Sequence, residues 1–472
     1  MKLPISFIES TRALMGDEEY QELSVALEQE PPASVRLNSK FPGLAACSSI
    51  SGRIPWAAEG YYLNQRLTFT FDPLFHAGCY YVQEASSMFV EQVLRRYVTT
   101  PVKMLDLCAA PGGKSTHARS VLPKGSLLVA NEVIRNRSQI LAENLTKWGY
   151  ADVVVTNNDP SDFSRIGSFF DVILTDVPCS GEGMFRKDPG AIEEWSPENV
   201  EICWQRQRRI ITDIWPCLKP GGILIYSTCT YNTREDEENI AWIRQEFGAE
   251  PLPLAVPAEW NITGSLLAGS DAPVYRFLPH KTQGEGFFLA ALRKPEEDRE
   301  ADTDLFSPKK KKLKGNTAAS PVSKENLAIA KSWLASSAEY NLLVNGTAIT
   351  AFPVYYQNDL ALLRQSLRIV QAGTEVAEVK GKDLIPAHGL AMSRLLKTSV
   401  FPTEALTYEQ AIAYLRKEAI VLPPSVPKGY VLVTYKEIPL GFVKNIGNRA
   451  NNLYPQEWRI RSGYLPDDIR TL

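Results

Sequence analysis

Long apolar runs are missing from this sequence of 472 residues. No stretch of 18 apolar residues, the length needed to cross a membrane, occurs anywhere in the chain. The first twenty residues include the charged side chains Lys2, Glu9 and Arg12 and contain no apolar core, so we expect no secretory signal peptide. These absences predict a cytoplasmic protein without a membrane partner.

Histidine is scarce, and the cysteines are scattered. The chain has 4 His and 7 Cys, and no two Cys form a C-x-x-C pair. We therefore expect neither a zinc site nor a disulfide framework, and hence no metal. Free thiols in a reducing compartment are usually small core residues, but one or two can carry chemistry.

Neither sign of charge dominates the composition. The formal net charge is −3, with 44% hydrophobic and 22% charged residues, which is typical of globular proteins. Such a balance excludes a uniformly basic nucleic-acid coat, so any RNA contact must use local patches. The length predicts two to four domains.

One stretch, residues 103–115 (KMLDLCAAPGGKS), resembles a ligand-binding turn but lacks two familiar signatures. A short apolar strand leads into a turn of small residues and then into a helix, which brings backbone N–H groups and a positive dipole end towards a ligand. A P-loop needs glycine where Cys108 stands. The dinucleotide pattern G-x-G-x-x-G is absent too, because only Gly112 and Gly113 occur, side by side.

Apolar runs and helical patterns alternate between residues 103 and 293. We expect strands at 103–107, 126–131, 152–156, 171–175 and 222–227, with helices at 114–121, 134–148 and 198–218. This alternation predicts a doubly wound, Rossmann-like parallel α/β sheet. Two further runs, 273–279 and 286–293, predict an antiparallel hairpin that ends the sheet with one reversed strand.

The flanking regions differ in composition. Residues 1–30 predict one helix that ends at Pro31-Pro32, and the aromatic residues that follow, such as Trp56 and Tyr61, are more typical of a core than of a base-stacking surface. Residues 295–322 combine an acidic block with a lysine run and predict a linker. A helix near 325–335 and a strand-rich tail at 429–454 follow.

The residues at the expected strand ends form a series. The five strands lead in order to Asp106, Glu132, Asp159, Asp176 and Cys229. Ligands of open parallel sheets bind at the carboxyl ends of the strands. Four carboxylates would repel a phosphate without a metal, but they suit the cationic, ribose-bearing methyl donor S-adenosylmethionine.

Two cysteines at neighbouring strand ends indicate a particular chemistry. Cys179 follows the fourth strand and Cys229 follows the fifth. Beside a methyl donor, a thiolate that adds to C6 of a pyrimidine makes C5 able to accept the methyl group. Each cysteine taken alone is more often a small buried residue.

Three motifs carry a family resemblance: LDLCAAPGGKS, DVPCSGEG and YSTCTYN. They resemble the signatures of the Nop/Sun family of RNA cytosine-C5 methyltransferases, and both termini are most similar to its bacterial RsmF-type 16S rRNA methyltransferases. The resemblance implies S-adenosylmethionine as cofactor, and 16S rRNA or the small ribosomal subunit as partner. It further implies that the tail is a PUA-like RNA-binding module.

The resemblance also implies roles for individual residues. Cys229 would attack C6, Cys179 would assist product release, and Asp176 would lie near the target base. Apart from the resemblance, three groups are candidates for favouring the Cys229 thiolate: Lys114, a helix N-terminus and the cations that bind phosphate. The implied cofactor-binding residues are Cys108, Ala109, Ala110, Pro111, Gly112, Gly113, Lys114, Glu132, Asp159 and Asp176.

Together these patterns predict five parts. They are an N-terminal α+β RNA-binding domain (1–95), a methyltransferase domain (96–294), a charged linker (295–322), a mixed α/β extension (323–395) and a PUA-like domain (396–472). We expect a monomer.

Other functions stay open at this stage. The catalytic motifs do not separate ribosomal from transfer RNA as the substrate. DNA cytosine methylation would use Cys179 as the nucleophile and leave Cys229 without a role. A non-catalytic RNA-binding assembly factor would retain the fold alone, and a P-loop NTPase is disfavoured by Cys108.

Overall fold

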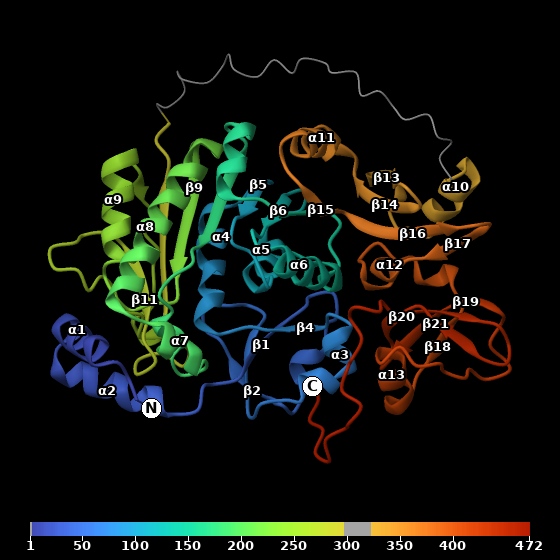
Figure 1. Ribbon diagram of the computed structural model, residues 1–472. Helices are drawn as coiled ribbons and strands as arrows, with labels where there is room; N and C mark the ends of the chain where they lie inside the picture. The colour runs from blue at the N-terminus through green and yellow to red at the C-terminus, as the bar shows by residue number, and fades with distance from the viewer. Residues whose placement is uncertain (1, 297–321) are drawn as a thin grey trace.

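The computed structural model describes residues 2–296 and 322–472, and a large mixed sheet forms its centre (Figure 1). The strand order is β10-β12-β9-β8-β5-β6-β7-β15, and β11 pairs with β12. The strands are β5 (Lys103–Asp106), β6 (Leu127–Asn131), β7 (Val153–Thr156), β8 (Phe170–Asp176), β9 (Leu218–Thr228), β10 (Glu250–Pro251), β11 (Val274–Phe277), β12 (Phe287–Arg293) and β15 (Ile369–Ala372). Strands β5 to β9 run parallel, which confirms the predicted doubly wound sheet.

Helices cover both faces of this sheet. Along β7, Val153 and Val155 face one apolar cluster and Val154 faces the other, because successive strand residues point to opposite faces. Near-continuous apolar strands of this kind are typical of a parallel sheet that is buried on both sides. One cluster includes α4 (Val90–Tyr97), α5 (Gly113–Val121) and α6 (Arg135–Trp148); the other includes α8 (Pro197–Ile214), α9 (Glu237–Phe247) and α11 (Gln357–Ser366).

The two edges of the sheet differ from the expectation in one respect. The predicted hairpin is present, with β12 antiparallel to β9 and β11 antiparallel to β12. A second reversed strand, β15, comes from the C-terminal extension and pairs with β7 at the other edge. The prediction of one reversed strand was therefore incomplete. Strand β15 covers backbone groups that β7 would otherwise expose at a bare edge.

The N-terminal part contains two helices where one was predicted. The chain breaks at Gly16, whose φ of 86° disfavours other residues, and this separates α1 (Ile5–Met15) from α2 (Asp17–Glu28). A four-stranded antiparallel sheet follows, in the order β2-β3-β1-β4. Its strands are β1 (Ser34–Leu37), β2 (Ile50–Arg53), β3 (Gly60–Leu63) and β4 (Tyr80–Val82), and the short helix α3 (Pro73–His76) precedes β4 in the chain. Trp56 and Tyr61 are buried, as expected of core residues.

The C-terminal half contains two further four-stranded sheets. The first part consists of α10 (Lys324–Ser332), β13 (Tyr340–Asn345), β14 (Ala348–Pro353), β16 (Thr374–Lys380), β17 (Asp383–Pro386) and α12 (His388–Met392). The second consists of β18 (Thr403–Ala405), α13 (Tyr408–Leu415), β19 (Gly429–Tyr435), β20 (Ile438–Asn445) and β21 (Ala450–Asn452), which confirms the strand-rich tail. The predicted linker lies, apart from residues 295, 296 and 322, outside the described residues.

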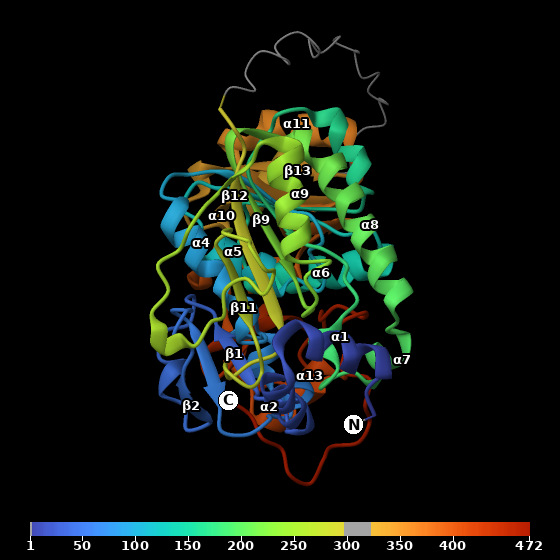
Figure 2. The ribbon, with the colours of Figure 1, turned by 90° about the vertical axis from the view of Figure 1, so that its left-hand side faces the viewer.

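The last module packs back onto the N-terminal sheet, next to α3 (Figure 1). One apolar cluster contains Val35 and Tyr80 together with Leu415 and Val431. The backbone N–H of Leu472 donates to the buried carboxylate of Asp72 at 2.9 Å. Figure 2 shows the N-terminal helices and sheet below the central sheet. No helix in the described part of the chain combines the length and apolarity that a membrane span needs.

Candidate active site

Two cysteines meet at the carboxyl ends of neighbouring strands. β8 and β9 are parallel, with Asp176 opposite Ser227, so the loops that follow them leave the sheet side by side. Cys179 Sγ and Cys229 Sγ lie 3.3 Å apart, and the backbone N–H of Cys229 donates to Cys179 Sγ at 3.4 Å. Both thiols are free and half-buried. The expected juxtaposition of the cysteines is present.

The environment keeps the Cys179 thiol protonated. Its hydrogen bond with Cys229 and its burial raise the pKa of Cys179 well above the ordinary value, and nearby Glu235 adds to the effect. A protonated Cys179 beside Cys229 can donate a hydrogen bond or a proton. A pair of adjacent thiols can combine a nucleophilic sulfur with a proton donor.

A half-buried ion pair, between Lys114 and Asp176, lies near the thiols. Lys114, in the first turn of α5, lies with its Nζ 2.8 Å from Asp176 Oδ2, and Asp176 Oδ1 accepts a hydrogen bond from Ser227 Oγ at 2.8 Å. Burial alone would lower the pKa of Lys114. The negative charge of Asp176, and to a smaller extent Cys229, outweighs the effect of burial, so the pKa of Lys114 is raised. Lys114 therefore carries a fixed positive charge that favours a thiolate nearby.

The small-residue turn lines a cleft of about 450 Å³. Gly112 has a φ of 113°, which strongly favours glycine, and leads directly into α5. Two side chains of α6 hold the backbone of the turn in place, because Arg137 donates to the Ala110 carbonyl and Asn144 donates to the Pro111 carbonyl. The cleft wall contains Cys108, Ala109, Ala110, Pro111, Gly113, Lys114 and Asp176 together with Ser34, Arg66, Tyr81, Gln83 and Lys187.

Three further acids from the strand-end series have separate environments. Asp106 is fully buried, accepts a hydrogen bond from Ser115 and has one oxygen without a partner among the described residues; burial raises its pKa to about 7. Glu132 is buried, and it accepts from the backbone of Ile134 at 2.8 Å. Asp159 is half-buried, and its side chain accepts from the backbone N–H of Ser161 at 3.1 Å, which caps the short 3-10 helix Pro160–Ile166.

The structure thus brings most of the predicted site residues together, but not all of them. Glu132, Asp159, Gly112, Cys179 and Cys229 do not line the 450 Å³ cleft. Burial raises the pKa of the Cys108 thiol, and the negative charges of Asp106, Asp176 and Glu132 raise it further. These three acids therefore lie close to the turn.

Two arginines of α8, Arg208 and Arg209, make contacts within the protein, whereas Arg206 is exposed. Arg208 donates to Asn239 at 3.1 Å and lies 4.0 Å from the ring centre of Trp204. Arg209 lies 3.5 Å from Asp159. These contacts favour a structural role for Arg208 and Arg209 over contacts with RNA phosphate.

Sequence reasoning missed two buried glutamates that bind the cysteine loops. Glu182 and Glu235 are 2% and 0% exposed, and each accepts hydrogen bonds from the loop that carries the other cysteine. Glu182 stands inside the DVPCSGEG motif, but no spacing in the sequence indicates a partner some 50 residues away.

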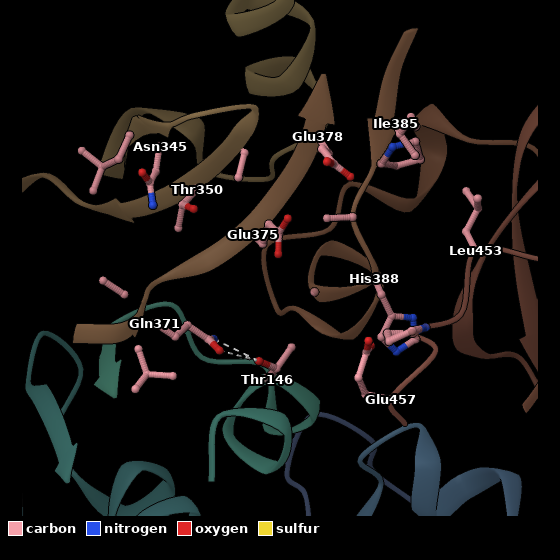
Figure 3. A pocket seen from close by; sticks show the side chains of 18 of the residues that line it. Thr146, Asn345, Thr350, Gln371, Glu375, Glu378, Ile385, His388, Leu453 and Glu457 are labelled. Carbon is pink, nitrogen blue, oxygen red and sulfur yellow. Dashed lines mark hydrogen bonds between the residues drawn. The ribbon is translucent and has the colours of Figure 1, made fainter. Parts of the chain in front are cut away.

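A larger cavity, of about 990 Å³, lies elsewhere (Figure 3). Its wall includes Glu375, Glu378 and His388, and Gln371 bonds Thr146 across it at 3.0 Å. No cysteine and no strand-end acid belongs to its wall, whereas Cys108, Lys114 and Asp176 line the smaller cleft. Within the described residues, no group of three His, Cys, Asp or Glu side chains is placed to hold a metal ion.

Family comparisons cover most of the chain. Residues 99–293 match 16S rRNA methyltransferase RsmB/F, residues 3–85 match the N-terminal domain of 16S rRNA methyltransferase RsmF, and residues 401–460 match the methyltransferase RsmF PUA domain. Two relatives are named ribosomal RNA small subunit methyltransferase F. The protein from Shigella boydii is 32% identical over 87% of this chain and 85% of its own. That from Serratia proteamaculans is 31% identical over 98% of each.

Solved structures show the same fold. A methyltransferase homolog protein from Pyrococcus horikoshii is 29% identical, with a TM-score of 0.53 over 61% of this chain and 94% of its own. NSun6 from Pyrococcus horikoshii, solved with SFG, has a TM-score of 0.52 at 23% identity and covers 62% of this chain and 98% of its own.

Proposed function

The chain belongs to the 16S rRNA methyltransferases of the RsmB/F family, and from that membership we propose that it methylates C5 of a cytosine in 16S ribosomal RNA. It is an S-adenosylmethionine-dependent rRNA methyltransferase. The position of the methyl group and the roles of the residues are our proposal. The observation that carries it is the 3.3 Å contact between Cys179 and Cys229 beside Lys114 and Asp176.

The residues around the turn fit S-adenosylmethionine. The cofactor combines a cationic sulfonium with a ribose and an amine, and the site offers buried carboxylates at Asp106 and Glu132 and a half-buried carboxylate at Asp176. One oxygen of Asp106 has no partner within the described chain. Next to Glu132, Val133 and Ile134 are 55% and 51% exposed and offer apolar surface to a purine. We propose that Cys108–Lys114, Glu132, Asp159 and Asp176 hold the cofactor, which supplies the methyl group.

The two thiols have complementary tasks in this proposal. Cys229 adds to C6 of cytosine and forms a covalent bond, which makes C5 electron-rich enough to take the methyl group. Lys114 favours the Cys229 thiolate, because its charge is fixed by Asp176. A water molecule then takes the C5 proton, the C5=C6 double bond re-forms, and Cys229 leaves as a thiolate that can accept the proton of the Cys179 thiol. Cys179, held as a thiol, assists this release.

The substrate reaches the thiols as an unstacked base. A cytosine within a helix cannot approach a half-buried thiol, so it must leave its stack. Arg66 and Lys187 line the cleft and provide cations for the phosphates that flank the base. The PUA module, packed on the N-terminal sheet, extends this RNA-binding surface. We propose the domain limits 1–95, 96–294, 295–322, 323–395 and 396–472, a cytoplasmic location and a monomeric enzyme.

A methylation assay tests the proposed substrate. Purified protein is incubated with radiolabelled S-adenosylmethionine and, separately, 16S rRNA, small ribosomal subunits and bulk transfer RNA. We expect label in one or both ribosomal substrates, and bisulfite sequencing should find 5-methylcytosine there. Label in transfer RNA alone would reassign the substrate, and no label in any lane would support a non-catalytic assembly factor.

A further inference from the structure

Hydrogen bonds cross between the two loops that carry the cysteines. The Cys179 loop spans residues 177–183 and the Cys229 loop spans residues 229–235. Each loop contributes a buried glutamate that accepts hydrogen bonds from the backbone of the other loop. We call Glu182, Asn232 and Glu235 the carboxylate clamp.

The first arm of the clamp runs from the Cys179 loop to the Cys229 loop. Glu182 Oε2 accepts hydrogen bonds from the backbone N–H groups of Tyr231 at 2.7 Å and Asn232 at 2.9 Å. Its other oxygen accepts from Trp195 Nε1 at 3.0 Å. The backbone adds a parallel bond, from Gly183 N–H to the carbonyl of Cys229 at 2.8 Å. The nucleophile's own peptide is thus tied to the opposite loop.

The second arm runs in the reverse direction. Glu235 Oε2 accepts from the backbone N–H of Ser180, the residue after Cys179, at 3.0 Å. Gln207, from α8, donates both to Glu235 Oε2 at 2.7 Å and to the carbonyl of Pro178, the residue before Cys179, at 3.0 Å. Both peptides that flank Cys179 are therefore fixed through Glu235 and Gln207.

Asn232 joins the two arms. Its Nδ2 lies 3.1 Å from Glu182 Oε1 and 2.9 Å from Glu235 Oε1. A further side-chain bond, between Ser180 Oγ and Thr230 Oγ1 at 3.0 Å, runs alongside. Every donor around Glu235 faces an oxygen of its carboxylate. In a glutamine at this position, one of these oxygens would be an NH2 group, which would face another donor.

Burying the two glutamates of the carboxylate clamp costs free energy, and neither side chain serves as a surface residue. Burial raises the pKa of Glu235 to about 7, against the opposing effect of its bonds to Ser180 and Asn232. Buried carboxylates of this kind are tolerated only where hydrogen bonds compensate for lost hydration. Here those bonds converge on the two segments whose thiols lie in contact.

We propose that Glu182 and Glu235 are positioning residues that hold Cys179 and Cys229 within reach of one base. The effect of the two glutamates on catalysis rests on the proposed function. Their effect on the distance between the two thiols does not depend on that function. Loosened loops would let the thiols separate by an ångström or more, a misplacement that costs an enzyme about 100-fold in rate.

Disulfide formation measures this geometry without substrate. The thiols at 3.3 Å need only a small approach to form a bond of about 2.05 Å. The full-length protein is treated with diamide, which takes up both thiol hydrogens as the S–S bond forms, and the loss of free Cys179 and Cys229 is followed by mass spectrometry. The variants are Glu182→Gln, Glu235→Gln and Asn232→Ala. The matched control is Glu91→Gln, a buried carboxylate that accepts from the backbone of Ala58 and touches neither loop.

We expect Glu182→Gln and Glu235→Gln to form the disulfide about tenfold more slowly than wild type, with Glu91→Gln unchanged. In the methylation assay, kcat falls by about 100-fold while KM for RNA and cofactor stays near wild type. If either glutamate variant does not fold, the half-buried Asn232→Ala decides, since it removes the bridge and keeps both carboxylates. If the folded variants form the disulfide at or above the wild-type rate, the proposal that the clamp positions the two thiols is wrong. This conclusion holds whether or not the proposed function is correct.

Discussion

Cys179 Sγ and Cys229 Sγ lie 3.3 Å apart, each at the end of a parallel strand and neither in a disulfide. Contact between two half-buried thiols is not needed for stability, since a pair of small apolar side chains would fill the same space. The arrangement gains meaning from its surroundings. Lys114 supplies a fixed charge, and the cofactor turn lies on the same edge of the sheet.

Replacing Lys114 by methionine should slow methyl transfer. The variant keeps a long side chain but removes the charge that favours the Cys229 thiolate, and we expect kcat to fall by about 100-fold. The reaction of Cys229 with iodoacetamide, measured across pH in a Cys179→Ser background, should need a higher pH. The control is Lys103→Met, which removes another half-buried lysine, paired with Asp359 far from the thiols. An unchanged alkylation profile for Lys114→Met would contradict this role.

Asn158 should link the C-terminal extension to the cofactor site. Its side chain accepts from the backbone N–H of Arg368 at 3.0 Å and donates to the carbonyl of the same residue, just before β15. Its backbone bonds Asn131, whose carbonyl accepts from Ala109 of the cofactor turn. We expect Asn158→Ala to weaken S-adenosylmethionine binding about tenfold, because the backbone N–H of Arg368 loses its partner and the Arg368 carbonyl keeps only the bond from the N–H of Asn157. Calorimetric titration measures this, and an unchanged affinity would mean that β15 only covers the sheet edge.

Acid should destabilise the fold through its histidines. Burial lowers the pKa of His117 from 6.5 to about 4, despite its bond to Glu91, and lowers that of His76 and His388 to about 3. Between pH 6.5 and 4 the unfolded chain binds protons that the folded His117 does not bind, so stability is lost as the pH falls through this window. From pH 7 to 5 we expect His117 alone to cost about 2 kcal/mol.

Urea unfolding at pH 7 and pH 5 measures this loss. The wild-type midpoint should fall at pH 5, and His117→Gln should show a smaller fall because it cannot take up the proton. An equal fall in both proteins would assign the acid sensitivity to other groups.

The central sheet could be predicted from the sequence because its signal is local. Runs such as residues 126–131 and 152–156 are apolar without alternation, and the residues that follow each run reach one edge of the sheet by topology alone. The order of the strands therefore sufficed to place Cys179 and Cys229 together. The carboxyl-end rule also placed Asp106 and Asp176 near the cofactor turn.

Contacts between distant segments could not be predicted in this way. Strand β15 pairs with β7 across more than two hundred residues, and no pattern within residues 369–372 specifies that partner. The carboxylate clamp depends on the register of two loops some 50 residues apart. The break at Gly16 was missed because the apolar pattern continues through it, and only the backbone shows the change of direction.

A covalent-trapping experiment tests the central claim most directly. Wild type, Cys179→Ser and Cys229→Ser are incubated with S-adenosylmethionine and small-subunit rRNA and then resolved on a denaturing gel. The account predicts a slowly migrating protein–RNA adduct with Cys179→Ser, because release is blocked after Cys229 has bonded to the base, and none with Cys229→Ser. An adduct with Cys229→Ser and none with Cys179→Ser would contradict it and make Cys179 the nucleophile.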